Sequence, residues 1–200
     1  KMIILPILFF ITAILYSSVG FGGGSTYLAL LLIWDIPYYI FPVIALFCNI
    51  IVVTGNSINY VRAGNYNFRL LLPFLFGSIP LAFFGGTLII NKEIFEVLLF
   101  LVLSIAGIFL LINNKSYESK NLVTKKLNLF ISIFIGSILG LISGIIGIGG
   151  GIFLSPILFI LKADKPKIII TTASLFILIN SISGVLGHLS KENVLNEIFL

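Results

Sequence analysis

Two clusters of glycine are the residues of this sequence whose type and spacing are best suited to ligand binding. The first is Gly20–Gly24 (GFGGG) and the second is Gly147–Gly151 (GIGGG), and each lies inside a hydrophobic run. A glycine weakens a helix that it interrupts by about 1 kcal/mol relative to alanine. It also lets the backbone turn with a positive φ and lets a ligand approach the chain closely. The clusters therefore predict two breaks in the helical backbone.

A helix that begins directly after such a break makes the break suited to an anion. The first N–H groups of a helix have no partner within it, and the helix dipole places partial positive charge at the same end. The sequence predicts helices that begin at Ser25 and at Ile152. Two such ends facing one central region would bind an anion without a lysine or arginine. Ser25 and Thr26 add hydroxyl donors on one side only, so we expect an asymmetric site.

Polar side chains on the long apolar segments that follow the breaks are the next candidates. Asn49 lies in the first segment, and Thr172 and Asn180 lie in the second. Any one of them is also typical of an interhelical hydrogen bond, worth about 0.6 kcal/mol in a membrane. We predict substrate contact first at the deepest positions, Asn49 and Asn180. The full set of predicted substrate-binding residues is Gly22, Gly23, Gly24, Ser25, Asn49, Gly149, Gly150, Gly151, Thr172 and Asn180.

Close helix packing is the alternative role for the same glycines. In each cluster two glycines are four residues apart, which is typical of helices that pack through small residues. Gly136, Gly140 and Gly144 continue this spacing without a break, and for that ridge we predict packing. Three consecutive glycines exceed what a ridge needs, so for the two clusters we favour a binding loop.

The composition is that of a membrane protein. Of the 200 residues, 59% are hydrophobic and 10% are charged, whereas soluble domains carry roughly 25% charged residues. Apolar runs of about 18 residues recur along the chain, which is typical of membrane-spanning helices. We therefore predict an all-α fold, a polytopic membrane protein whose surroundings are the lipid bilayer.

Several other classes of function are disfavoured. Aromatic residues lie within the apolar runs rather than among lysines and arginines, so the net charge of +5 does not indicate nucleic-acid binding. Cys48 is the single cysteine and His188 the single histidine. A lone cysteine excludes an internal disulfide and a CxxC metal site, and we expect a structural or interfacial role for His188. We predict no enzyme activity, no catalytic residues, no metal and no cofactor.

The apolar segments predict the order of the helices. The segments that follow the two breaks, 25–34 and 152–161, extend about 15 Å as helices and are too short to span a membrane. Residues 113–126 carry four lysines and no apolar period. We predict a cytoplasmic linker there, between a first transmembrane repeat, 1–112, and a second, 127–200. Longer apolar segments are expected at 2–19, 39–61, 69–90, 95–112, 127–146 and 168–189.

An internal repeat relates the two halves. A shift of 127 to 128 positions superimposes the two halves and places the first glycine cluster on the second. Each cluster is followed by a short apolar segment, a turn with a proline and a long segment. Repeats of this kind are typical of transporters. The first half continues well beyond Asn65, whereas the second ends seven residues after the matching Asn193. We expect that C-terminal helices of the second repeat are missing from this sequence.

The positive charges predict the orientation. With the linker in the cytoplasm, nine of the twelve basic residues fall on that side, and Lys1, Lys92 and Lys191 fall outside. This is the distribution that the positive-inside rule requires. Each half then crosses the membrane an odd number of times, so the repeats are inverted. Inverted repeats place a binding site near the bilayer midplane.

These motifs resemble the TauE/SafE sulfite exporter family of membrane permeases. The resemblance rests on GxGGGxxxxPxL at Gly147–Leu158 and on the run Thr171–Leu175, with Gly20–Gly24 and Arg62–Asn65 in the first half. It covers essentially the whole chain. The resemblance implies transport of small sulfur-containing anions such as sulfite, sulfonates or sulfoacetate.

The sequence therefore predicts a permease or exporter of small sulfur-containing anions in the cell membrane. It would work by alternating access, with the anion held at the helix N-termini after the breaks. Ala29 stands where the second copy has Pro156, which argues against symmetric binding. A non-transporting scaffold or assembly subunit, or a transporter of another small anion, is the alternative. The substrate, the direction, the coupling ion and assembly into a homo-oligomer stay open.

Overall fold

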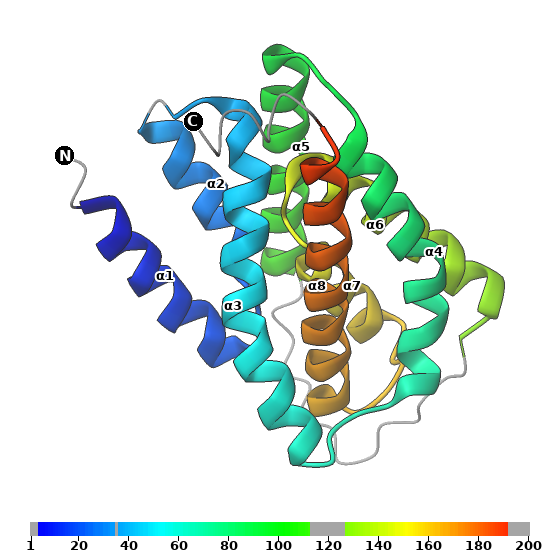
Figure 1. The fold of residues 1–200 in the computed structure, drawn as a ribbon. Coiled ribbons are helices and arrows are strands. Elements are labelled where there is room, and N and C mark those ends of the chain that lie inside the picture. Colours follow the sequence, from blue (N-terminus) through cyan, green and yellow to red (C-terminus); the bar gives the residue numbers. More distant parts are fainter. Residues whose placement is uncertain (1–3, 35, 113–126, 192–200) are drawn as a thin grey trace.

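The computed structural model describes residues 4–34, 36–112 and 127–191, and the elements of these ranges are all helices. This confirms the all-α prediction. The predicted linker 113–126, Lys1 and residues 192–200 lie outside the described residues. The helices (Figure 1) are α1 (Ile4–Val19), α2 (Gly24–Ile33), the 3₁₀ helix η1 (Tyr38–Ile40), α3 (Phe41–Arg62), α4 (Phe68–Thr87), α5 (Lys92–Ile112), α6 (Leu129–Ile146), α7 (Gly151–Ile160) and α8 (Pro166–Leu189).

The outer surface is that of a membrane protein. Within the described part of the chain, four helical segments are long and apolar enough to cross a bilayer: η1 with α3, then α4, α6 and α8. Large hydrophobic side chains point outward from them. Phe76 is 80% exposed and Phe130 is 78% exposed. Such a surface is unfavourable in water, whereas lipid tails accept it, and the helices satisfy their own backbone hydrogen bonds there.

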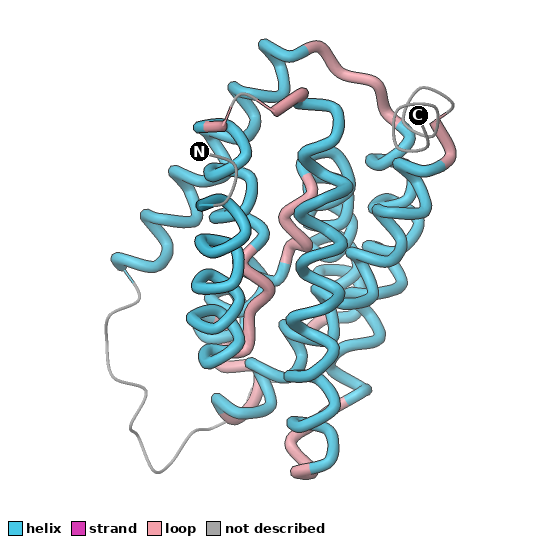
Figure 2. The backbone as a smooth tube through the Cα atoms, turned by 60° about the vertical axis from the view of Figure 1, so that its left-hand side comes forward, coloured by secondary structure: helices cyan, strands magenta, loops and turns pink. Residues whose placement is uncertain are grey.

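Both predicted glycine breaks are present. The chain leaves the helix between α1 and α2 and again between α6 and α7. Gly23 and Gly150 precede α2 and α7 with φ of +84° and +75°, a left-handed conformation that other residues rarely adopt. Figure 2 shows loop segments inside the helix bundle as well as at its ends. At 10 residues each, α2 and α7 are too short to cross a membrane alone.

Helix α4 packs closely against α6 along the predicted glycine ridge. Because the contacts advance together along both helices, α4 and α6 run parallel. A side chain at any of the three ridge glycines would collide with the α4 backbone. The packing role predicted for this ridge is confirmed. The contacts join Gly136 to Phe74, Gly140 to Ser78 and Gly144 to Ala82.

Helices α3 and α8 pack antiparallel at the centre of the molecule (Figure 1). Leu46, early in α3, lies against Gly184, late in α8. Ser57, late in α3, forms a hydrogen bond of 3.2 Å with Ser174, early in α8. The sequence repeat equates these two helices, and an inverted repeat requires that equivalent helices run in opposite directions.

The connections before α2 and α7 make reciprocal contacts. Gly20 in the first break lies against Ile170 at the start of α8. Gly147 in the second break lies against Pro42 at the start of α3. A shift of 128 positions matches Pro42 with Ile170, so each half contacts the other through the same surface. The inversion of the complete halves stays a prediction.

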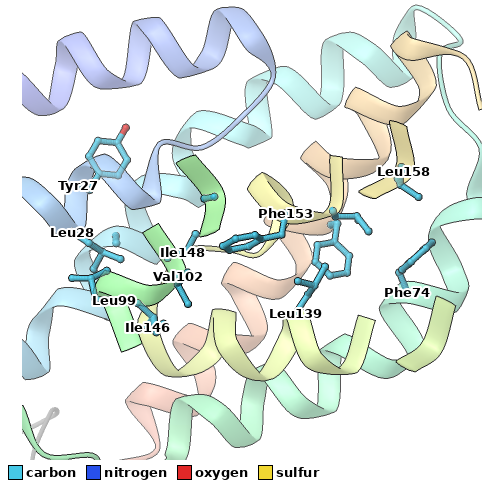
Figure 3. Packing of buried hydrophobic residues seen from close by; sticks show 14 of the residues in the cluster. Tyr27, Leu28, Phe74, Leu99, Val102, Leu139, Ile146, Ile148, Phe153 and Leu158 are labelled. Carbon is cyan, nitrogen blue, oxygen red and sulfur yellow. The ribbon is translucent and has the colours of Figure 1, made fainter. Parts of the chain in front are cut away.

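The buried core is apolar and continuous around the short helices. Figure 3 shows Phe153 of α7 and Ile148 of the second break among core side chains from the neighbouring helices. Leu28 of α2 and Leu154 of α7 are fully buried. The broken segments are therefore packed within protein, which is the condition for irregular backbone at membrane depth.

Two hydrogen bonds define the ends of the bundle. Asn67 Nδ2 donates to Asp164 Oδ2 at 2.8 Å, which joins the loop before α4 to the loop before α8. Lys191 Nζ donates to the Leu88 carbonyl at 2.6 Å, which joins the residues after α8 to the end of α4. We call these the Asp164 end and the Lys191 end. Arg62, Arg69, Lys162, Lys165 and Lys167 belong to helix ends and loops on the Asp164 side, so their predicted grouping on one side is confirmed.

Candidate functional site

The two glycine breaks meet at Asn49 of α3. Gly22 lies so close to the Asn49 side chain that no Cβ atom fits between them. A Cβ atom on Gly24 would lie 2.7 Å from Asn49 Nδ2 and 2.8 Å from the Ile148 carbonyl oxygen in the other break. A Cβ atom on Gly149 would lie 2.9 Å from the same Asn49 nitrogen. The glycines are needed here because backbone from both breaks closes around one side chain.

Asn49 links α3 to the second break. Its Nδ2 donates a hydrogen bond of 3.1 Å to the Ile148 carbonyl. Its Oδ1 is buried and has no partner among the described residues. The side chain is 0% exposed, and a buried polar atom without a partner costs about 1–3 kcal/mol. Unpaired polar atoms in an apolar interior are typical of sites where a ligand or water completes the hydrogen bonding.

Helices α2 and α7 begin at this meeting point with unpaired N–H groups. Within the described ranges, the N–H groups of Gly24, Ser25, Gly151 and Ile152 form no hydrogen bond. The next amides of each helix donate back to the carbonyl of its N-cap glycine. Each helix start carries about half a positive charge from its dipole. Two sets of free donors therefore begin beside Asn49 in buried surroundings, and such donors suit an anion.

The two sides of the site differ in polarity. Gly22 and Gly24 face Asn49, whereas Gly149 and Gly151 both lie against the apolar side chain of Ile177, with Gly149 also near Asn49 Nδ2 and the Ser181 hydroxyl. A shift of 128 positions matches Asn49 with Ile177. The asymmetry expected from the residues after each break thus extends to the long helices that cover the breaks.

The central glycine of each break packs against the preceding long helix. Gly23 lies against Thr12 and Tyr16 of α1, and Gly150 lies beside Ser143 of α6 as well as Phe176 of α8. These two glycines are thus needed both for their positive φ and for close packing. The packing and binding-loop hypotheses do not exclude each other at these positions.

Comparisons with known proteins identify the family of the chain. The model of the family "Sulfite exporter TauE/SafE" matches residues 5–200. The chain belongs to this family. Its curated relatives include a probable membrane transporter protein of Sinorhizobium fredii, 25% identical over 96% of this chain and 78% of that protein. A second, from Methanocaldococcus jannaschii, is 30% identical over 96% of this chain and 74% of that protein. A third, from Bacillus subtilis, is 23% identical over 96% of this chain and 80% of that protein. No solved structure matches the chain.

Within this TauE/SafE protein, two of the predicted site residues form hydrogen bonds inside their own helix. The Thr172 hydroxyl donates to the Ile168 carbonyl at 2.8 Å, and Asn180 Nδ2 donates to the Phe176 carbonyl at 2.9 Å. Both side chains are buried, and Asn180 Oδ1 lacks a partner among the described residues. The hydrogen bonds of these two residues do not join them to the breaks, in contrast to Asn49.

Ser25 is buried at the start of α2, beside the meeting point. Its neighbour Thr26 shares a hydrogen bond of 2.8 Å with the Tyr16 hydroxyl. The Thr26 hydroxyl is therefore already used within the first half. Ser25 lies in the first turn of α2, and its role as a donor stays a prediction.

Sequence reasoning missed Ile177 and the Ile148 carbonyl as parts of this site, and it noted Ser181 as a polar residue of the α8 segment without including it in the predicted binding set. The Ser181 hydroxyl is buried without a described partner, and a Cβ atom on Gly149 would lie 3.2 Å from it. Ile177 and Ser181 are four residues apart in α8 and so share one helix face. The repeat would have identified this face, because it matches Ile177 with Asn49.

His188 has the structural role that the sequence suggested. It is buried near the end of α8, and its Nε2 lies 2.7 Å from the Gly144 carbonyl. A carbonyl only accepts hydrogen bonds, so Nε2 carries the proton. This bond ties α8 to the glycine ridge of α6. Among the described residues, no three His, Cys, Asp or Glu side chains gather as metal ligands would.

Proposed function

We propose that this protein is a multi-pass transporter of the cell membrane for small sulfur-containing anions such as sulfite or sulfonates. The observation that carries the proposal is the meeting of both glycine breaks at Asn49. Membership of the TauE/SafE family and the transporter names of the relatives support it. A scaffold protein would need the glycine ridge of α6, but it would not need unpaired helix starts in its interior.

Neutral donors hold the anion in this proposal. Gly24 and Ser25 donate from one side, and Gly151 and Ile152 donate from the other. An asparagine amide has two N–H groups, and the Ile148 carbonyl takes one of those of Asn49. The second is left for an oxygen of the anion. No cation lies within the two breaks, so the anion is held by partial charges, which favours release as well as binding.

The proposed mechanism is alternating access. The helix starts form the bound state near the midplane, and rocking of one half against the other opens the site to one end of the bundle and then the other. The antiparallel helices α3 and α8 pack the two halves against each other, with Asn49 on α3 and Ile177 on α8. We place the cytoplasm at the Asp164 end, where the basic residues gather.

Flux measurements in proteoliposomes test this function. Purified protein is reconstituted, and the entry of sulfite, methanesulfonate and sulfoacetate is followed against protein-free vesicles. The proposal expects saturable flux of at least one of these anions and no flux of a neutral analogue. Lack of flux for every sulfur oxyanion and sulfonate would overturn the substrate assignment. Binding without flux would favour a scaffold or sensor.

A further inference from the structure

A cavity lies at the Lys191 end, outside the meeting point of the breaks. Its volume is about 300 Å³. It lies between the start of α3, the ends of α4, α6 and α8, and the start of α5. The residues that line it are Tyr38, Tyr39, Pro42, Leu88, Ile89, Ile90, Phe95, Ile145, His188 and Lys191.

Lys191 lines this cavity, and one of its three N–H groups has no hydrogen-bond partner among the described residues. Its Nζ donates to the Leu88 carbonyl at 2.6 Å and lies 3.4 Å from His188 Nδ1. The bond between His188 Nε2 and the Gly144 carbonyl leaves Nδ1 as an acceptor, so the ammonium donates to it. An ammonium has three N–H groups. Two are thus used by neutral acceptors, and the third has no partner among the described residues and is available to a ligand in this proposal.

Among the described residues, the positive charge of Lys191 has no carboxylate partner. None of the described residues that line the cavity is an Asp or Glu. The ion pair found within the described part of the chain joins Lys92 and Glu96 instead. Burial lowers the pKa of Lys191 from its usual range to about 8. A bound anion would offset this burial by stabilising the charged ammonium.

The rest of the cavity is apolar and aromatic. Phe95 packs against Tyr38 with ring centroids 6.1 Å apart, and Pro42 and Ile145 add aliphatic surface. A ligand that fits this lining has a negatively charged head at Lys191 and a short apolar body. Inorganic anions offer the head alone.

The cavity adjoins the second glycine break. Pro42 lines the cavity and also lies against Gly147. Ile145, which lines it as well, precedes Gly147 by two residues in the sequence. A ligand bound at Lys191 would therefore lie beside the second glycine break, which contributes to the central site.

We propose that the cavity at Lys191 is an entrance site that captures small organic sulfonates from the Lys191 side before they reach Asn49. This inference rests on the proposed function and adds to it a second binding position and a substrate subclass. Lys191 supplies the charge, and the lining of Pro42, Phe95 and Ile145 selects an anion with an apolar tail.

Titration calorimetry on the Asn49→Leu variant favours this site, because the affinity of the central site is lowered there. Methanesulfonate, butanesulfonate and sulfate are titrated at pH 7 into purified protein. We expect methanesulfonate to bind, and Lys191→Met to weaken it about tenfold, which is typical of a lost charge-assisted hydrogen bond. Lys191→Arg should retain the affinity. Lys92→Met is the matched control, because it removes an exposed lysine at the same end, and it should change nothing.

Two further comparisons test the apolar lining and the charge. Butanesulfonate should bind more tightly than methanesulfonate, by up to about fourfold for each fully buried methylene, and sulfate should bind more weakly than either. Between pH 7 and pH 9 the affinity for methanesulfonate should fall as Lys191 loses its proton, since the sulfonate keeps its charge over this range. The titratable groups that face Lys191 in the cavity are His188, Tyr38 and Tyr39, and the Lys191→Met variant shows whether they contribute.

Unchanged methanesulfonate binding after Lys191→Met, or no binding in the Asn49→Leu protein, would overturn the entrance site. Sulfate binding as tightly as butanesulfonate would overturn the selection of organic sulfonates. Flux through the wild-type protein is measured separately. Flux that persists without binding at Lys191 would reject the entrance site and keep the proposed function. Binding at Lys191 without any flux would reject the proposed function and leave the cavity as a binding site with no role in entry.

Discussion

Replacing Asn49 with leucine separates a binding role from a structural role at the centre of the molecule. Leucine has the same branched outline as asparagine but neither donates nor accepts hydrogen bonds. The change removes the bond from Asn49 Nδ2 to the Ile148 carbonyl, and it also removes Oδ1, which has no partner among the described residues. These two losses act on stability with opposite signs.

The expected change in stability is small. The Ile148 carbonyl, left without its donor, costs about 1–3 kcal/mol. Removing a buried oxygen that already lacks a partner returns a similar amount. The free energy of unfolding should therefore change by less than about 2 kcal/mol. The change also removes the second N–H of Asn49, which donates to the anion in the proposed site. A hydrogen bond to a charged group is worth about 1.5–3 kcal/mol, so the affinity for the anion should fall roughly 10- to 150-fold.

The assay pairs thermal unfolding in detergent with sulfite flux in proteoliposomes. Ser57→Ala is the matched control, because Ser57 lies on the same helix about 12 Å further along and joins α3 to α8 through Ser174. The control should lose about 0.6 kcal/mol and keep its transport. A large loss of stability in Asn49→Leu, with substrate affinity unchanged, would refute the binding role and leave Asn49 as interhelical packing.

Three further outcomes follow from the packing and the charge distribution. Gly24→Ala should lower anion affinity and transport, because the new Cβ atom pushes the two breaks apart. The control Gly55→Ala, whose Cβ atom would have nothing within 4 Å, should leave transport unchanged and stabilise α3 by up to about 1 kcal/mol. Equal transport by both variants would contradict this. Gly140→Leu should destabilise the protein by about 1–3 kcal/mol or more, because the side chain would collide with the α4 backbone. The loss would be measured as a lower midpoint of thermal unfolding, and an unchanged midpoint would contradict the packing. A cysteine at position 162 in a cysteine-free background should react with a membrane-impermeant maleimide only from the cytoplasmic side, and reaction from outside would reverse the orientation.

Periodicity and composition sufficed for most of the fold. The apolar runs predict the helices to within a few residues, and α6 and α8 end at the predicted Ile146 and Leu189. The two breaks follow from the weak helix propensity of consecutive glycines. The ridge from Gly136 to Gly144 was recognisable because small residues at four-residue spacing lie on one helix face. Each of these features depends on residues that are close together in the sequence, so the pattern of residues in that segment predicts it.

The contacts within the site are not local, and the sequence predicts them less well. Asn49 and Asn180 both occupy buried, central positions, yet the hydrogen bond of Asn49 reaches the second break, whereas the Nδ2 of Asn180 bonds to its own helix. The rotation of each long helix about its axis decides this difference. A membrane helix whose lipid-facing side is as apolar as its packed side carries little periodic signal for that rotation. The role of Ile177 opposite Asn49 depends on the same rotation.

The central claim is that an anion binds between the starts of α2 and α7. Diffraction from crystals of the protein soaked in selenite, a selenium analogue of sulfite, tests it most directly, with Cys48 replaced by alanine to remove the thiol. The account predicts an anomalous selenium peak within hydrogen-bonding distance of the N–H groups at Gly24 and Gly151 and of Asn49 Nδ2. Selenium found only at other positions, with the two helix starts bare, would contradict it.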